Sequence, residues 1–362
     1  MTPPVGVVGA SARAAAMSLV RAGYAPWAVD LFTDRDLLRI AECVRCPLDR
    51  YPDALPELCD RFPPGPILYT GGLENHPAVV GELARRRSLW GNGPESLAAV
   101  RDPFAVAATL ATAGFATPGL LPRSQSVPPD GRFVSKPLRS SGGLGVRFAR
   151  SGEAATPERY QQEWIDGPPM SAVFVGSADT TTLLDITDQL IGEPWLHAGA
   201  FAYCGNVGPV PVTAGLRDLV AGVGRTLGRV GRLRGPWGLD FVLRDGLPYP
   251  LEINPRYTAG VEVLELARSD KSTSNAIGKA VYYAPHRLTF PRAGPWDADL
   301  ADTFDPWRMP GFADIPAAGE VIDAGSPVLT FFAAGSTAAA CRATLRERAA
   351  DLDRLFVEES TR

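Results

Sequence analysis

The amino-terminal part of the chain alternates short apolar strands with helices, and this alternation constrains the fold more than any other feature. An apolar strand within residues 4–11 ends in glycines, and an alanine-rich helix over 13–21 follows it. A second strand ends at Asp30, and a third, at 66–70, leads into a helix over 78–87. Strands that alternate with helices in this way predict a parallel sheet covered by helices.

The pattern changes after a proline-rich, polar stretch at 122–132, which itself follows a helix expected from Pro94 to about Ala113. Short strands with tight turns then dominate, interrupted by a helix over 216–231. The turn at 245–246 reads Asp-Gly, a strong hairpin signal. We expect strands at 133–135, 146–149, 160–165, 171–174, 180–188, 239–243 and 248–253. The sequence therefore predicts an α+β region behind an α/β domain.

Composition excludes several classes of protein. The 362 residues carry a net charge of −4, which argues against a generally basic nucleic-acid binder. The five cysteines are few and odd in number, so we expect no disulfide scaffold and a reducing cytoplasm. No signal peptide is apparent after Met1, and the longest uncharged stretch, 324–341, is interrupted by Pro327. We therefore expect a cytoplasmic protein without a membrane partner.

Lysine is rare, since only Lys136, Lys271 and Lys279 occur among the 36 basic residues. Lys136 ends a predicted strand, and a loop rich in serine and glycine, 140–145, follows it. Glycines let backbone N–H groups approach an anion, and a lysine adds a point charge, so the two together can hold phosphate. The loop is not a Walker A motif, because the lysine precedes the glycines and a strand follows. The alternative is a plain hairpin turn.

Carboxylate and amide side chains gather on the predicted hairpin. Glu252 and Asn254 are two residues apart on one strand and so share a face, and both carry the oxygen ligands that Mg²⁺ prefers. A strict two-residue turn at 245–246 would place Asp240 opposite Leu251, on the wrong face. A one-residue bulge or a longer loop would correct this register. The alternative is a solvated hairpin with polar side chains.

The order of these motifs resembles that of the ATP-grasp superfamily of carboxylate–amine ligases, over nearly the whole chain. Between the lysine loop and the hairpin lies an extended segment, 162–167, of the kind that can meet an adenine edge, although alone it reads as an ordinary strand end. The resemblance assigns phosphate contacts to Lys136 and to the loop of Ser140, Ser141, Gly142, Gly143 and Gly145, adenine contacts to Glu163, Trp164 and Ile165, two Mg²⁺ ions (Mn²⁺ as an alternative) to Asp240, Glu252 and Asn254, and the transferred phosphoryl group and substrate to Arg256.

The resemblance also implies the domain organisation. It predicts an α/β pre-ATP-grasp domain with a parallel sheet at 1–94, central helices and a lid subdomain at 95–165, and a second α+β ATP-grasp subdomain at 166–362. The stretch from Ala313 to Gly335 resembles the closing strands of such ligases. Two positions depart from the family pattern. Pro103 stands where a phosphate-binding lysine is usual, a role that Arg101 could take, and Pro169 stands where a ribose-binding glutamate is usual.

The resemblance implies ATP, Mg²⁺ and two small-molecule substrates, a carboxylate and an amine, joined through an acyl phosphate with release of ADP. Two motifs, 71–77 and 254–262, are most similar to the tyramine-glutamate ligase subgroup associated with methanofuran and other one-carbon cofactor pathways. Glu74 and Glu262 are candidate substrate contacts, with an exposed or structural acid as the alternative. A homodimer is compatible with this class. The competing hypothesis is a nucleotide-binding regulatory protein without catalysis.

Other motifs give weaker hypotheses. Cys43, Cys46, Cys59 and His76 could bind zinc, but their spacing fits no usual pair of ligand pairs. A glycine-containing turn near Gly9 with Asp30 could bind a dinucleotide, yet the full glycine fingerprint is missing, so a degenerate domain that serves the substrate is preferred. His197 and His286 lack partners for a serine triad and are interpreted as structural.

Overall fold

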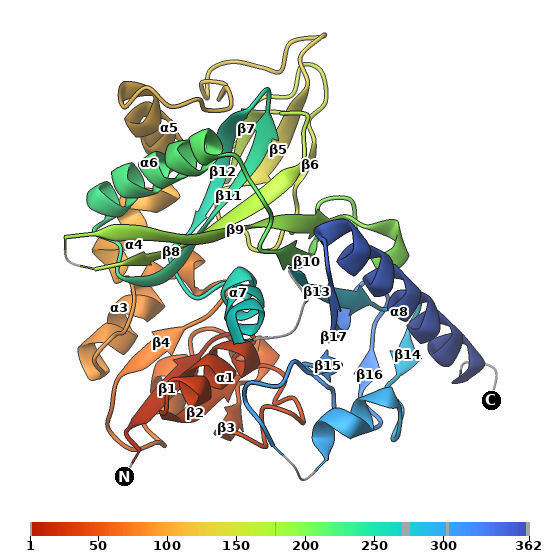
Figure 1. Cartoon of the computed structure of the whole chain (residues 1–362). Helices are drawn as coiled ribbons and strands as arrows, with labels where there is room; N and C mark the ends of the chain where they lie inside the picture. The colour runs from red at the N-terminus through yellow and green to blue at the C-terminus, as the bar shows by residue number, and fades with distance from the viewer. Residues whose placement is uncertain (1, 178, 270–275, 302–303, 360–362) are drawn as a thin grey trace.

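The computed structural model describes residues 2–177, 179–269, 276–301 and 304–359. Its amino-terminal part contains a four-stranded parallel sheet in the order β3-β2-β1-β4, flanked by helices (Figure 1). The predicted parallel sheet is therefore confirmed. The elements are β1 (Pro4–Val8), α1 (Arg13–Arg21), β2 (Ala25–Asp30), β3 (Glu42–Arg45), α2 (Leu55–Cys59), β4 (Ile67–Tyr69) and α3 (Pro77–Arg86).

This sheet is buried on both faces, as expected for parallel strands. Val5, Val7 and Val8 are fully buried although successive side chains point to opposite sides. Gly6 leaves room for the ring of Trp27 on the neighbouring strand, because a Cβ at Gly6 would lie 2.3 Å from that ring. The strand thus packs against apolar residues on both sides.

The single helix predicted over 94–113 is wrong, because the chain forms two helices there, α4 (Pro94–Arg101) and α5 (Pro103–Thr112). Pro103 has no N–H to continue the first helix, and it restricts the residue before it to an extended conformation. Asp102 adopts that conformation, and its carboxylate caps α5 by accepting from the N–H groups of Phe104 and Ala105. The break places Arg101 at the end of α4.

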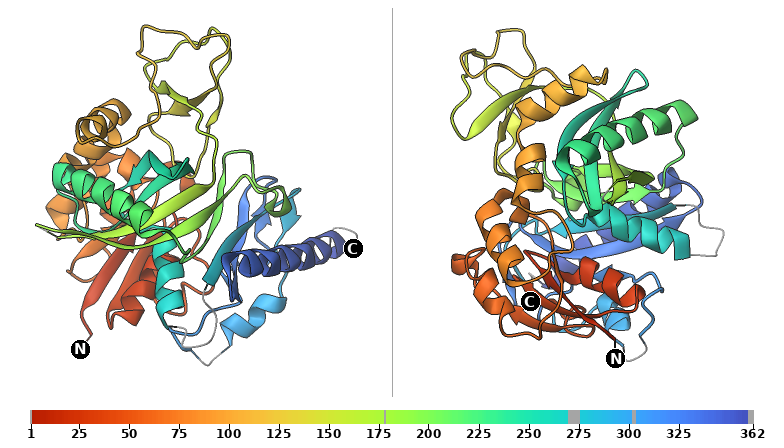
Figure 2. Two further views of the ribbon diagram at one scale, coloured as in Figure 1. Left: turned by 45° about the horizontal axis from the view of Figure 1, so that its top comes forward. Right: turned by 90° about the vertical axis from the view of Figure 1, so that its left-hand side faces the viewer.

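A three-stranded antiparallel sheet projects from the body of the molecule (Figures 1 and 2). Its order is β6-β5-β7, and β5 carries Lys136 near its carboxyl end. The strands are β5 (Phe133–Pro137), β6 (Arg147–Phe148) and β7 (Arg159–Glu163), close to the predicted ranges. Because β5 pairs with both neighbours, the loop from residue 138 to 146 is anchored at each end.

An eight-stranded antiparallel sheet forms the rest of the core, in the order β12-β11-β8-β9-β10-β13-β17-β15. Helix α6 packs on one part of this sheet and α8 on β13 and β17, while α7 lies between it and the amino-terminal domain (Figure 1). The sequence prediction missed α7 and α8. The elements are β8 (Pro169–Gly176), β9 (Thr181–Ile191), β10 (Tyr203–Gly208), α6 (Ala214–Gly231), β11 (Gly235–Arg244), β12 (Leu247–Asn254), α7 (Ala259–Ser269), β13 (Ala276–Tyr283), β15 (Phe312–Ala313), β17 (Pro327–Gly335) and α8 (Ala338–Glu359), with β14 (Leu288–Thr289) and β16 (Val321–Ile322) paired apart from it.

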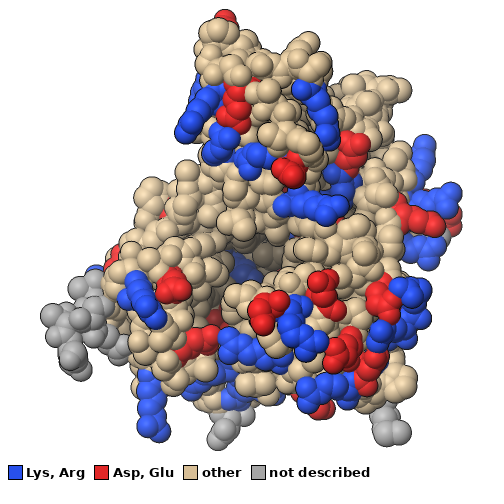
Figure 3. All heavy atoms as spheres, turned by 180° about the vertical axis from the view of Figure 1, so that it is seen from behind, with Lys and Arg blue, Asp and Glu red and all other residues tan. Residues whose placement is uncertain are grey.

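Together the sheets give the mixed fold predicted from the sequence, an α/β amino-terminal domain followed by two α+β parts. Among the described residues, no helix is both long and apolar enough to cross a bilayer. The face in Figure 3 shows a central hollow, and basic and acidic side chains are interspersed around it. All five cysteines are free thiols.

Candidate active site

A pocket of about 480 Å³ lies between the projecting sheet and the large sheet, where strands β8 to β12 line it. This volume is within the range of about 300–1,000 Å³ that is typical of small-molecule sites. Ser140 lines an adjoining pocket instead, and Gly145 lines neither. The pocket brings together these predicted residues: Lys136, Ser141, Gly142, Gly143, Glu163, Trp164, Ile165, Asp240, Glu252, Asn254 and Arg256.

A β-bulge in the hairpin of β11 and β12 brings the polar side chains to one face. Asp240 pairs in register with Glu252, but the next residue, Phe241, pairs with Pro250. Leu251 is therefore the extra residue of a bulge. This bulge corrects the register in the way that the sequence requires if Asp240 is to share a face with Glu252. Asp240 and Glu252 lie directly opposite each other and project toward the same side of the sheet.

Asp240 is held at the bottom of the pocket by neutral donors. Ser171 donates its hydroxyl hydrogen bond to Asp240 Oδ1 at 2.8 Å, and Asn254 Nδ2 donates to Oδ2 at 2.9 Å. Burial and the neighbouring charge of Glu252 raise the pKa of Asp240 to about 6. The two carboxylates thus form a negative site that lacks a full complement of positive charge.

These residues fit a divalent cation. Two carboxylates and an amide oxygen are hard ligands of the kind that Mg²⁺ prefers, and a cation would offset the repulsion between Asp240 and Glu252, which lie directly opposite each other. Asp240, Glu252 and Asn254 would hold such an ion. Because Mg²⁺ takes six ligands, phosphate oxygens and water would complete its coordination.

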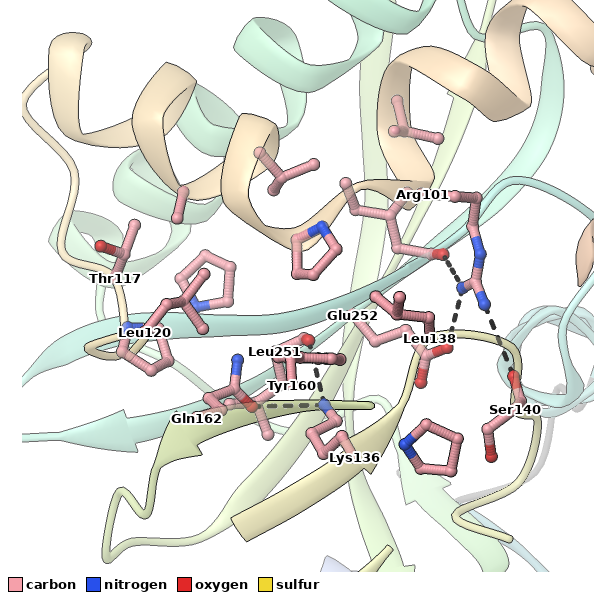
Figure 4. Close-up of a pocket in the computed structure, with 18 of the residues that line it drawn as sticks. Arg101, Thr117, Leu120, Lys136, Leu138, Ser140, Tyr160, Gln162, Leu251 and Glu252 are labelled. Carbon is pink, nitrogen blue, oxygen red and sulfur yellow. Dashed lines mark hydrogen bonds and ion pairs between the residues drawn. The ribbon is translucent and has the colours of Figure 1, made fainter. Parts of the chain in front are cut away.

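Lys136 lies against the bulge (Figure 4). Its Nζ donates to Gln162 Oε1 and to the carbonyl oxygen of Leu251, each at 3.3 Å, and lies 5.7 Å from the ring centroid of Tyr160. None of these partners is a carboxylate, so none competes with an anionic ligand for the ammonium group.

The glycine loop folds back over the pocket. Gly142 accepts at its carbonyl from the N–H of Tyr203 at 3.0 Å, with Gly142 itself at φ +62°. Gly143 has φ +80°, and a Cβ there would lie 1.8 Å from the carbonyl oxygen of Phe201. Glycine is therefore required at this point both for the backbone conformation and for the close approach. The Phe201 ring in turn packs against Phe148 and Trp164 of the projecting part.

The segment after β7 forms one wall of the pocket. Glu163 is tied to Gly119, since its N–H donates to the Gly119 carbonyl at 2.7 Å and its carboxylate accepts the Gly119 N–H at 2.9 Å. The backbone N–H of Trp164 donates to the carbonyl oxygen of Arg132 at 2.8 Å. Within the described part of the chain, no hydrogen bond involves the N–H of Ile165, which is buried in this wall. That donor is free for a ligand in the pocket.

Arg256 is buried against the amino-terminal domain. Its Nη2 lies 2.8 Å from Glu74 Oε1 and donates to Asn254 Oδ1 at 3.1 Å. Burial alone would raise the pKa of Glu74, but the charge of Arg256 outweighs burial and holds that pKa below its usual value. Glu74 is a fully buried, ionised acid whose charge is paired with Arg256, which gives it a structural role beside the site.

Arg101 approaches the pocket from the end of α4. It forms an ion pair with Glu252 at 2.8 Å and donates to Asn75 Oδ1 at 2.6 Å (Figure 4 shows its contacts with the hairpin and with Ser140). Asn75 also donates to the carbonyl of Ser140 at 3.0 Å. The loop that carries Glu74 and Asn75 thus touches three parts of the site.

Glu262 lies elsewhere, inside a buried ion cluster. Its carboxylate pairs with Arg13 and, at 2.7 Å, with Lys279, and it lines neither the pocket of about 480 Å³ nor the adjoining one. Arg13 also pairs with Asp314 at 3.0 Å. The cluster joins α1, α7 and β13. Lys271 lies outside the described residues.

Asp30 and His197 have partners within the protein. Both oxygens of Asp30 accept backbone N–H groups, from Ala12 on one side and from Phe32 and Thr33 on the other, so neither is free for a ribose. His197 pairs with Asp353 at 2.7 Å. Across the described residues, no three His, Cys, Asp or Glu side chains are placed to hold a metal, so the cysteines and His76 do not form the zinc site considered from their sequence.

The sequence prediction missed several polar residues of the site. Ser171, Gln189 and Thr258 line the pocket, and Asn75 lies behind it. Thr258 follows Arg256 by two residues and Asn75 follows Glu74 directly, so the motifs already in view contained a signal for both. Ser171 and Gln189 lie on β8 and β9, where nothing in the local sequence distinguishes them.

Comparison with known proteins identifies a family model for part of the chain. Residues 100–260 match the family model described as an ATP-grasp domain. No curated protein matches the sequence.

Solved structures share the fold over nearly the whole chain. An L-amino acid ligase from Bacillus licheniformis has a TM-score of 0.65 at 15% identity, and 96% of each chain is covered. The phosphoribosylamine–glycine ligase of Thermotoga maritima has a TM-score of 0.63 at 16% identity, again with 96% of each chain covered. The biotin carboxylase domain of the Hydrogenobacter thermophilus 2-oxoglutarate carboxylase, solved with MgADP, has a TM-score of 0.68 at 14% identity and covers 93% of this chain and 87% of that one.

Residues 100–260 therefore match an ATP-grasp domain, and the chain shares its fold with the structures compared above. Membership of the whole chain in that superfamily, and the subgroup within it, stay predictions.

Proposed function

We propose that this protein is an ADP-forming ligase that uses ATP to join a carboxylate to an amine. The observation that carries the proposal is the convergence, on one pocket, of Lys136 and the glycine loop with Asp240, Glu252 and Arg256 of the bulged hairpin. The likeness to an amino acid ligase and to a phosphoribosylamine–glycine ligase supports it.

Nucleotide binding follows from the walls of the pocket. The free N–H of Ile165 would donate to the adenine edge, beside the backbone of Glu163 and Trp164. Lys136 would contact the phosphates, and the N–H groups of the loop formed by Ser140, Ser141, Gly142, Gly143 and Gly145 would close over them. Arg101 would add charge at the position where Pro103 removes the usual lysine.

The reaction then needs positioning and charge more than covalent chemistry. A substrate carboxylate oxygen attacks the γ-phosphorus of ATP, and the bond from that phosphorus to the β–γ bridging oxygen breaks. The products of this step are an acyl phosphate and ADP. Arg256 would neutralise the charge of the transferred group. An amine nitrogen then attacks the acyl carbon, the carbon–oxygen bond to phosphate breaks, and the amine releases a proton. Mg²⁺, held by Asp240, Glu252 and Asn254, would neutralise phosphate charge.

Finer assignments follow from the sequence motifs. We place the ligase in the cytoplasm, in methanofuran-type or other one-carbon cofactor biosynthesis, acting on small molecules and compatible with a homodimer. We keep the division into 1–94, 95–165 and 166–362, with Glu74 closer to the reacting groups than Glu262. Substrate trials that include tyramine with L-glutamate test the pathway.

A coupled assay of ADP release tests the function. The full-length protein is incubated with ATP, Mg²⁺ and pooled carboxylates, with hydroxylamine as a general amine that traps acyl phosphates. Carboxylate-dependent ADP and hydroxamate formation is expected. ATP binding without turnover over a broad panel would favour the silent regulatory protein instead.

A further inference from the structure

Arg101 forms an ion pair with Glu252, one of the carboxylates that would bind the metal. Its Nη1 lies 2.8 Å from Glu252 Oε1 and also donates to the carbonyl of Ile253 at 3.3 Å. Its Nη2 donates to Asn75 Oδ1 at 2.6 Å and reaches the carbonyl of Ser140 at 3.5 Å. These neutral acceptors fix the guanidinium plane, so the charge is aimed at Glu252.

Two of the acids around the pocket are paired with arginines. Glu74 is paired with Arg256, and Glu252 is paired with Arg101. The side chain of Arg101 is 15% exposed, so its charge is only weakly screened by water. A divalent cation that binds Glu252 in this arrangement would meet a guanidinium in contact with the same carboxylate, and the two positive charges would repel each other.

Phosphate groups would remove this conflict. Arg101, Lys136, Ser140 and Glu252 line one continuous pocket (Figure 4), so a polyphosphate beside Lys136 comes within reach of Arg101. Guanidinium binds phosphate oxygens in a two-pronged manner, which gives Arg101 an alternative partner. Glu252 is then released for the cation.

We propose that Arg101 is a charge placeholder that makes metal binding depend on the nucleotide. Without nucleotide it neutralises Glu252, and with nucleotide it pairs with phosphate and yields Glu252 to the divalent cation. The inference rests on the proposed nucleotide site. Because such coupling is reciprocal, Arg101 must raise the affinity for metal and nucleotide together while lowering the affinity for the metal alone.

The test measures Mn²⁺ binding by electron paramagnetic resonance, with and without a non-hydrolysable ATP analogue. Arg101→Ala is expected to bind Mn²⁺ alone about tenfold more tightly than wild type and the metal-free analogue more weakly, which is within the usual range of coupling effects. Arg139→Ala is the matched control. Arg139 is exposed directly before the glycine loop, lines a pocket together with Arg101, and has no ion pair among the described residues. Its loss should leave Mn²⁺ binding unchanged.

Two further variants keep the test decisive. Arg101→Ala combined with Glu252→Gln should lose the gained Mn²⁺ binding, which locates the gain at this carboxylate. Asn75→Ala replaces Arg101→Ala in the test if that variant does not fold. It removes the 2.6 Å contact to Arg101 but keeps the arginine charge, so a smaller gain in Mn²⁺ affinity is expected. Equal Mn²⁺ affinity in wild type and Arg101→Ala, or an equal gain in Arg139→Ala, overturns the inference.

The outcomes also separate this inference from the ligase function. Nucleotide-dependent Mn²⁺ binding without any ADP release would contradict the ligase function but still support the proposed role of Arg101. Absence of nucleotide binding by the wild-type protein overturns both.

Discussion

Glu74 and Arg256 form a buried ion pair, with 2.8 Å between Glu74 Oε1 and Arg256 Nη2, although they lie far apart in the sequence. Glu74 belongs to a loop of the amino-terminal domain, and Arg256 follows the hairpin of β11 and β12. Gly71 in the same loop lies so close that a Cβ there would be 3.5 Å from the guanidinium carbon. The amino-terminal domain therefore orients Arg256, the side chain that we propose contacts the transferred phosphoryl group.

Replacing Glu74 by glutamine should lower kcat by about 10- to 100-fold, because a buried hydrogen bond to a charged group is worth about 1.5–3 kcal/mol and Arg256 loses its orientation. The affinity for ATP should stay within a factor of about two. Steady-state kinetics and calorimetry check both values, and Glu74→Asp should restore part of kcat. A raised KM for the amine at unchanged kcat would show instead that Glu74 binds the substrate.

Replacing Lys136 by alanine should weaken ATP binding by about 10- to 150-fold, since a charge-assisted contact to phosphate is worth about 1.5–3 kcal/mol. The fold should survive, because the lysine contacts only neutral acceptors. Calorimetry measures the affinity. Arg150→Ala, an exposed charge in the same projecting part, is the control. Unchanged ATP affinity in a folded Lys136→Ala protein would remove this residue from the site.

Sequence reasoning predicted those features that are set within a few residues. Glu252 and Asn254 must share a face because a strand has a period of two, and the position of Asp240 required a bulge that the structure has between Asp240 and Phe241. Pro103 was visible, yet the helix break it causes was overlooked. Local signals of this kind can be read from spacing.

The rest depends on contacts between distant parts of the chain. Glu262 pairs with Arg13, 249 residues away, and no local pattern distinguishes a buried acid from an exposed one on a helix. The same holds for Ser171, which reaches Asp240 only because β8 and β11 are neighbours in the sheet. Such residues are defined by topology, so they become apparent only when the fold is known.

Replacing Glu252 by glutamine should lower turnover by orders of magnitude while the protein stays folded. The amide keeps one oxygen ligand but removes the negative charge that favours a cation between bound phosphates. The predicted loss is measured as ADP release at saturating ATP over a range of Mg²⁺ concentrations, with circular dichroism as the check on folding. Near-normal turnover would contradict a metal-binding role and leave Glu252 only its ion pair with Arg101.

The aromatic contact between Phe201 and the projecting part should hold the glycine loop closed. Phe201 packs at 5.3 Å from Phe148 and 6.0 Å from Trp164, measured between ring centroids, and its carbonyl touches Gly143. Phe201→Ala should therefore speed nucleotide release by about 3- to 10-fold, since aromatic pairs contribute about 0.5–1.5 kcal/mol. Stopped-flow displacement of a fluorescent ATP analogue measures the rate. Val321→Ala, which changes an exposed apolar residue on β16, is the control. Equal release rates in wild type and Phe201→Ala would show that the Phe201 contact does not hold the loop closed.

The pH dependence of stability should report on Glu262. Burial alone would raise the pKa of this carboxyl group, but the charges of Arg13 and Lys279 outweigh burial and hold the pKa at about 2, below its ordinary value of 4.5. Since the pKa is lowered in the folded state, ionised Glu262 stabilises the fold above pH 4.5. This contribution, of about 3 kcal/mol, is lost as the pH falls from about 4.5 toward 2.

Glu262→Gln should destabilise the protein by about 3–5 kcal/mol at pH 7, because Lys279 is left buried without its counter-charge and Arg13 keeps only its other carboxylate partners, such as Asp314. The difference in unfolding free energy between wild type and variant should shrink as the pH falls below about 4.5, since protonation of Glu262 removes the same interaction from the wild type. Urea unfolding at several pH values between 7 and 3 measures it. Glu265→Gln on the same helix is the control, because burial raises the pKa of Glu265 and its loss should not flatten the acid side of the curve. A constant difference between wild type and Glu262→Gln over this pH range would mean that the cluster does not depend on the charge of Glu262.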